Sequence, residues 1–245
     1  LGFIYKVPLG NILGDEGYTH FLVAYNIYSV FLTVATAGLP VALSRMISEA
    51  NTMNRPNQVK RIFSVAWLTF CVLGVVCTLI MFLFPTELAD ALNDVEASQS
   101  ILALSPAVLL VCLTSAYRGY CQGHENMKPT TVGQVLEVLV KVVIGLVLAW
   151  YLKDLGKSLP LVSAGAIFGV TAGSLAALVY MFAYKRRNYA ALPGGGDEPE
   201  SRGQILSTLL KVGIPITLGS SVLSLINLVD SGLCMGWLQD AAGFS

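Results

Sequence analysis

Six long apolar runs separated by short polar gaps dominate this chain. The runs cover residues 17–44, 62–85, 97–117, 129–152, 158–184 and 212–239. Each run has at least ~20 residues, which as an α-helix cover the ~30 Å hydrocarbon thickness of a bilayer. A globule of 245 residues cannot bury six such helices in one core. The sequence therefore predicts an all-α polytopic membrane protein.

Composition supports this class and excludes a nucleic-acid-binding one. Charged residues make up 12% of the chain, against about 25% in a typical soluble protein. The net charge is zero, which leaves no basic surface for nucleic acid. Bases gather in the gaps after residues 44, 117 and 184, whereas acids gather at 86–96. By the positive-inside rule, the basic gaps are cytoplasmic and the acidic gap lies outside.

Residues 1–14 read as the second half of a membrane helix. They are apolar, but at ~1.5 Å per residue they are too short to span a bilayer. The first span then ends outside, at Asp15 and Glu16. We expect a fragment that lacks the first half of span one.

Prolines and glycines inside the runs predict bends and close packing. Proline removes a backbone donor and clashes with the preceding turn, so each span that holds one should kink or loosen there. The candidate hinges are Pro40, Pro106 and Pro215. Glycines at steps of four predict a tight helix-packing face on the 158–184 run, at Gly165, Gly169 and Gly173.

One apolar run carries polar residues on a single helical face. Gln134, Glu137 and Lys141 are spaced i, i+3 and i+7, and Glu137 precedes Lys141 by four, the favourable order for an ion pair. Two interpretations remain open. The pair is either a self-neutralised packing element or a pair of charges that lines a cavity and takes part in ion coupling.

Two further charges lie within spans. Asp230 follows Asn227 by one turn and has no base nearby, so it needs a partner on another helix, water, a cation or a substrate. Lys6 can neutralise Asp230, meet an anionic substrate or extend to the membrane interface.

Cysteines and histidines predict no catalytic or metal site. The five cysteines lie in or at the ends of apolar runs and have no metal-ligand spacing, as expected of small buried residues. His20 and His124 are far apart in sequence and close to the interfaces. We expect no metal and no cofactor, with coupling to the membrane potential, Na⁺ or H⁺ left open.

Three stretches resemble a known family. They are AGLPVALS at 37–44, RGYCQGHENMKPT at 118–130 and IPITLGSSVLSLINLVDS at 214–231. They are similar to the stage V sporulation protein B and polysaccharide-export group, which belongs to the multidrug/oligosaccharidyl-lipid/polysaccharide flippase superfamily. The resemblance implies a MATE-like fold with two six-helix lobes around a central cavity. It divides the chain into an N-terminal lobe (1–184), a cytoplasmic linker (185–203) and the first helix of the second lobe (204–245).

The resemblance also implies a function. It predicts an alternating-access flippase that moves a polyprenyl-pyrophosphate-linked saccharide across the bacterial cytoplasmic membrane, for sporulation, peptidoglycan or capsule, and that is monomeric when full length. Projected onto this chain, the cavity lining includes Lys6, Asn26, Asn227 and Asp230. The similar lipid II flippases carry arginines where this sequence has Tyr5 and Asn26.

Two alternatives stay open. A cation-coupled multidrug exporter of the same superfamily would use Asp230 or Glu137 as its ion site. A membrane-embedded transferase would need clustered carboxylates, and the only cluster, at 86–96, is typical of a solvated helix face. We therefore expect a protein that is not an enzyme, and the 118–130 stretch favours the polysaccharide branch.

Overall fold

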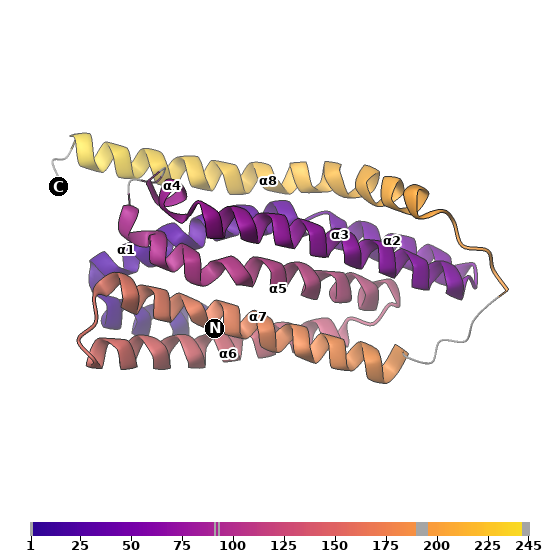
Figure 1. Ribbon diagram of the computed structural model, residues 1–245, viewed down its shortest axis with the longest axis horizontal. Coiled ribbons are helices and arrows are strands. Elements are labelled where there is room, and N and C mark those ends of the chain that lie inside the picture. Colours follow the sequence, from indigo (N-terminus) through magenta and orange to yellow (C-terminus); the bar gives the residue numbers. More distant parts are fainter. Residues whose placement is uncertain (1, 91, 93, 190–195, 242–245) are drawn as a thin grey trace.

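The protein is a bundle of long helices that run roughly parallel or antiparallel to one another (Figure 1). The computed structural model describes residues 2–90, 92, 94–189 and 196–241. Within these ranges the helices are α1 (Gly2–Thr36), α2 (Leu39–Thr52), α3 (Pro56–Leu83), α4 (Pro85–Asp90), the 3-10 helix η1 (Val95–Ala97), α5 (Ser98–Gly123), α6 (Lys128–Asp154), α7 (Leu159–Tyr189) and α8 (Arg202–Ala241). Four segments of the described part are long and apolar enough to cross a membrane: α3, η1 with α5, α6 and α7. The predicted all-α membrane fold is confirmed.

Helix α5 is the centre of the bundle, and α6 lies at its edge. α5 packs against α1, α2, α3 and α7, and its side chains from Ser100 to Gly123 are largely buried. α6 instead exposes an apolar stripe with a helical period: Val132, Val135, Leu139, Val143, Val147 and Trp150. An apolar stripe of this length is expected to face lipid chains rather than water.

Helix α1 reverses direction at Gly14. In a straight helix Tyr5 and Phe21 would be about 24 Å apart along the axis, yet their ring centroids are 6.0 Å apart. Gly14 has φ 69° and ψ −176°, a conformation that essentially only glycine adopts. The two arms of α1 therefore form a hairpin, and its turn is next to Asp15, where the sequence predicts that one span ends and the next begins.

The predicted 17–44 run is not one helix. α1 ends at Thr36 and α2 begins at Leu39, just before Pro40. Helix α8 approaches this break closely, because Gly38 donates its backbone N–H to Thr217 Oγ1 at 3.1 Å and a Cβ at Gly38 would overlap the carbonyl oxygen of Gly213. Only a residue without a side chain fits there.

The other two candidate hinges do not break their helices. α5 continues through Pro106, and α8 continues through Pro215. Gly213 and Thr217 contact the break ahead of Pro40, and Pro215 lies at the same height of α8 but on its opposite, exposed face. Movement at any of the three prolines stays a prediction.

The segment before α8 is attached to the turn between α2 and α3. The Asp197 carboxylate accepts hydrogen bonds from the backbone N–H groups of Asn57 (3.1 Å) and Gln58 (2.9 Å), which caps the start of α3. Desolvation raises the pKa of Asp197, but these hydrogen bonds outweigh it and hold the pKa below its ordinary value. Arg55 also donates to the Glu198 carbonyl at 2.8 Å.

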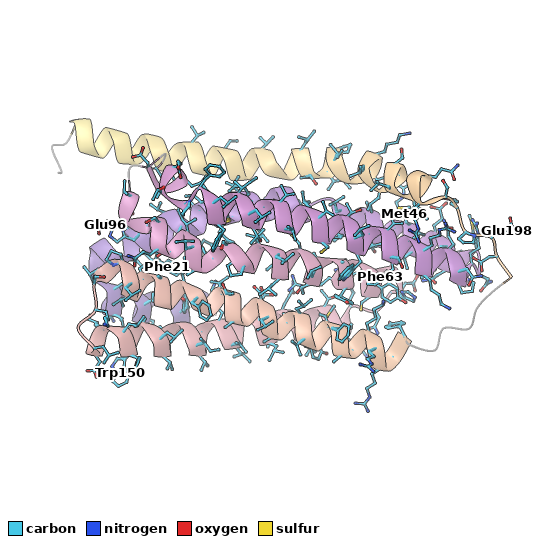
Figure 2. The ribbon with its side chains drawn as sticks, in the orientation of Figure 1. Phe21, Met46, Phe63, Glu96, Trp150 and Glu198 are labelled. Carbon is cyan, nitrogen blue, oxygen red and sulfur yellow. The ribbon has the colours of Figure 1, made fainter. Side chains whose placement is uncertain are left out.

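These contacts place two of the predicted cytoplasmic gaps, those after residues 44 and 184, at one end of the bundle. Figure 2 shows Glu198 and Met46 at this end, and Glu96 and Trp150 at the other. α7 continues through Tyr189 and α8 begins at Arg202, so the predicted linker at 185–203 is shorter at both ends than its polar composition indicates. The basic start of this segment extends α7 by about one turn.

The hairpin in α1 predicts different effects for two nearby glycines. Neither Gly10 nor Gly14 has an atom within 4 Å of an added Cβ, but only Gly14 has a positive φ. Gly14→Ala should therefore destabilise the protein by about 1–3 kcal/mol through backbone strain. Gly10→Ala should be neutral or stabilising by up to about 1 kcal/mol. Thermal unfolding in detergent checks both variants, and equal effects would contradict a strained turn at Gly14.

Candidate functional site

A largely buried ion pair joins α5 to α6. Arg118 Nη2 donates to Glu137 Oε2 at 2.6 Å, and the two side chains are only 16% and 22% exposed. The sequence assigns Arg118 to a polar gap, but α5 continues to Gly123 and keeps Arg118 inside the bundle. The turn between α5 and α6 is only four residues long, so the antiparallel helices bring these two side chains to similar heights.

The ion pair changes the interpretation of Glu137. Sequence spacing predicts Lys141 as its partner, whereas the structure pairs it with Arg118 on the neighbouring helix. Arg118 presents a planar guanidinium directly across the α5–α6 contact, and such a group binds a carboxylate strongly. Lys141 lies one helical turn from Glu137 on the same helix and brings a second basic residue to this region.

Lys141 lies at the middle of α6. It is 13 residues from Lys128 and 13 from Asp154, the two ends of the helix, which is about 20 Å from each end. Its Nζ is 5.0 Å from the ring centroid of Tyr25 and 5.4 Å from that of Tyr5. Both distances are within the range of a cation–π interaction. A lysine at mid-depth in a membrane helix is costly and marks a functional-site candidate.

Both tyrosines come from the α1 hairpin. Tyr18, Phe21, Tyr25 and Tyr28 follow one another at steps of three or four along the second arm, with ring centroids 5.8–6.1 Å apart. Tyr5 joins them from the first arm and donates its hydroxyl to the Ala166 carbonyl at 3.1 Å. The reversal at Gly14 is therefore what brings two rings to Lys141.

Glycines of α7 fix the position of α6. A Cβ at Gly169 would lie 2.6 Å from the Lys141 carbonyl oxygen, and a Cβ at Gly173 would lie 2.5 Å from the Glu137 carbonyl oxygen. The backbones of α6 and α7 are thus in direct contact beside the two charged residues. The tight packing face predicted from the glycine spacing is confirmed.

The structure places the other predicted site residues as follows. Asn26 is half-buried on α1, next to Tyr25, and Gln134 is exposed on α6. Lys6 lies on the first arm of α1, and Asn227 and Asp230 lie on α8. The side chains of these last three lie outside the described residues. Their predicted roles in the cavity stay predictions.

The two histidines lie at opposite ends of the bundle. His20 Nδ1 is 2.7 Å from Asp94 Oδ2, and His20 Nε2 is 3.3 Å from Glu96 Oε2, which connects α1 to the acidic segment. His124 follows the last residue of α5 and has its Nδ1 2.9 Å from the Tyr120 carbonyl oxygen. Among the described residues, no group of three or more His, Cys, Asp or Glu residues is arranged to hold a metal ion.

The arrangement defines a class of site. The Arg118–Glu137 ion pair, Lys141 and two tyrosine rings meet within a helical bundle whose outer surface is apolar. Such a site can hold an anionic group by charge and a flat, partly apolar group against the rings.

Comparison with solved structures shows a fold similar to those of two transporters. An inward-facing MATE family multidrug resistance transporter of the MOP superfamily has a TM-score of 0.73 at 16% identity, over 92% of this chain and 51% of that one. A MOP superfamily transporter from Pyrococcus furiosus has a TM-score of 0.62 at 16% identity, over 89% of this chain and 52% of that one.

Sequence comparison then shows the family. The polysaccharide biosynthesis protein family matches residues 1–243, and the chain belongs to it. Stage V sporulation protein B of Bacillus subtilis is 32% identical over 74% of this chain and 35% of its own length. The lipid II flippase MurJ of the same organism is 27% identical over 94% of this chain and 45% of its own length. The chain thus spans less than half the length of these two relatives. Its long apolar helices and its family show a multi-pass membrane protein.

The ion pair predicts a specific pattern of coupling energies. Glu137→Gln leaves the Arg118 charge buried without its partner, so it should lower the free energy of unfolding by about 1–3 kcal/mol. The coupling energy between Arg118→Gln and Glu137→Gln in a double-mutant cycle should also be about 1–3 kcal/mol. The cycle between Glu137→Gln and Lys141→Gln is the control and should give a smaller value. A larger coupling to Lys141 would contradict the pairing described here.

Proposed function

We propose an alternating-access flippase for a polyprenyl-pyrophosphate-linked saccharide as the function. The proposal concerns a protein that contains this chain and has the full length of the relatives. One observation carries the proposal: at mid-depth, the Lys141 ammonium lies against the rings of Tyr5 and Tyr25, one helical turn from Glu137 of the ion pair. A pyrophosphate that crosses the bilayer needs such a cation, because lipid offers no counter-charge. Membership of the polysaccharide biosynthesis family supports a saccharide as cargo.

The tyrosine rings suit the rest of the head group. Each ring has a flat apolar face and a polar hydroxyl, which together match the mixed surface of a sugar. The row from Tyr18 to Tyr28 extends along α1 toward the break ahead of α2. In this proposal the saccharide lies along that row, and the pyrophosphate lies at Lys141.

The main rival is a cation-coupled multidrug exporter. Such a transporter needs a buried acid that is free to bind a proton or a sodium ion. Glu137 is neutralised by Arg118, which supports the flippase instead. Asp230 keeps its proposed role in coupling or in substrate contact. The proposed setting is the bacterial cytoplasmic membrane, with the α2–α3 turn and the α8 start on the cytoplasmic side.

Transport by the full-length protein in proteoliposomes tests the proposal. We expect it to move a polyprenyl-pyrophosphate saccharide in preference to a cationic dye. Lys141→Gln should reduce this movement about 10- to 100-fold, as expected for the loss of a charge-assisted hydrogen bond worth about 1.5–3 kcal/mol. Lys141→Arg should retain most of it.

A matched lysine provides the control for this assay. Lys153 lies on the same helix as Lys141, near the C-terminal end of α6, where it donates to the Ile12 carbonyl oxygen. Lys153→Gln should therefore transport normally. Movement of the dye alone, driven by a proton or sodium gradient, would overturn the flippase proposal. Asp230→Asn in the same assay tests the coupling role, and full activity would remove Asp230 from the mechanism.

A further inference from the structure

A second group of cations lies at the opposite edge of the bundle from α8. A pocket of about 240 Å³ opens at the cytoplasmic end of α7 and is lined by Tyr117, Phe182, Lys185, Arg186 and Tyr189. It lies roughly four turns of α7 beyond Gly169, the glycine that contacts Lys141. The pocket is therefore separate from the candidate site at mid-depth.

Lys185 reaches back over aromatic rings of two other helices. Its Nζ is 3.5 Å from the ring centroid of Phe63 on α3, and 5.0 Å and 5.9 Å from the rings of Tyr120 and Tyr117 on α5. The rings hold the ammonium in place without neutralising its charge. Figure 2 shows Phe63 within the bundle, toward its cytoplasmic end.

The bases of this helix end have no acidic partner within the described residues. The ion pairs among all the described residues have His20, Arg55 or Arg118 as their basic member. None involves Lys185, Arg186 or Arg187. Two basic residues, Lys185 and Arg186, thus line the pocket together with three aromatic ones. An anion is the complementary ligand.

The pocket lies at the end of a lipid-facing stripe. Phe168, Leu175, Val179 and Phe182 are exposed at steps that keep them on one face of α7, and Arg186 continues this face one turn later. From Phe168 to Phe182 the stripe is about 21 Å long, which exceeds the ~15 Å of one leaflet's hydrocarbon. An acyl chain that lies along the stripe has its head group at Lys185 and Arg186.

We propose that this pocket binds the phosphate of an anionic phospholipid of the cytoplasmic leaflet, with the acyl chains along the α7 stripe. Lys185 and Arg186 contact the phosphate, and Tyr117 and Tyr189 enclose it. Basic pockets of membrane proteins at this depth are suited to anionic head groups. A soluble phosphate would not require the apolar stripe that leads to the pocket. This site is independent of the flippase proposal.

Lipid retention tests the site. The full-length protein is purified from nanodiscs of phosphatidylglycerol and phosphatidylcholine in equal amounts, and retained lipid is counted by native mass spectrometry. The wild type should keep phosphatidylglycerol over phosphatidylcholine. Lys185→Gln combined with Arg186→Gln should reduce that preference at least about tenfold, the smallest effect expected when one charge-assisted contact is lost.

The neighbouring base provides the matched control. Arg187 is exposed and does not line the pocket, so Arg187→Gln should keep the preference of the wild type. Arg186 is exposed too, so Arg186→Gln alone keeps the fold and should weaken the preference by itself. Unchanged retention in the double variant would overturn the proposal. Equal losses in Arg186→Gln and Arg187→Gln would overturn it as well, because they would indicate a general basic surface.

Discussion

The backbone contact between α6 and α7 is the constraint on which the candidate site depends. Lipid tails are as apolar as leucine, so membrane helices associate through close packing rather than through the hydrophobic effect. Gly169 and Gly173 provide that close packing, because neither position has room for a Cβ. The contact sets the rotation of α6. The apolar stripe of α6 is then on the outside of the bundle, where lipid is expected. Glu137 faces α5, and Lys141 faces α1.

The charges in the bundle follow from the same geometry. A buried carboxylate and a guanidinium neutralise each other across the α5–α6 contact, which reduces the cost of placing both within the membrane. Lys141 is stabilised differently, by two rings from the α1 hairpin. A cation held by aromatic faces keeps its charge. In the proposed function, the Arg118–Glu137 pair is a packing element and Lys141 meets the anionic group.

Much of the fold could be predicted from the sequence, because membrane helices leave strong local signals. The apolar runs, the basic gaps and the glycine repeat in α7 each depend on neighbouring residues alone. The reversal at Gly14 agrees with the polar pair that follows it. Pro40 predicts a bend near this position, but the extent of the break depends on the approach of α8 to Gly38, which no local pattern contains.

The site was less predictable, because its contacts join distant segments. Helical spacing correctly selected Glu137 and Lys141 as neighbours on one face, but it could not reveal that Arg118 reaches Glu137 from another helix. The tyrosines of α1 did carry a signal, since Tyr18, Phe21, Tyr25 and Tyr28 recur at helical spacing. Their significance depends on the hairpin, which brings Tyr5 to the same lysine.

The central claim is that the head group of a lipid-linked saccharide lies between Lys141 and the tyrosines of α1. The most direct test places a photo-crosslinking residue, benzoylphenylalanine, at Tyr25 of the full-length protein and illuminates it with a labelled polyprenyl-pyrophosphate saccharide. The same residue at Val143, which is 60% exposed on the lipid face of α6, is the control. The account predicts a crosslink from position 25 that excess unlabelled saccharide removes, and no such crosslink from position 143. Equal labelling at both positions, or labelling at 143 alone, would contradict it.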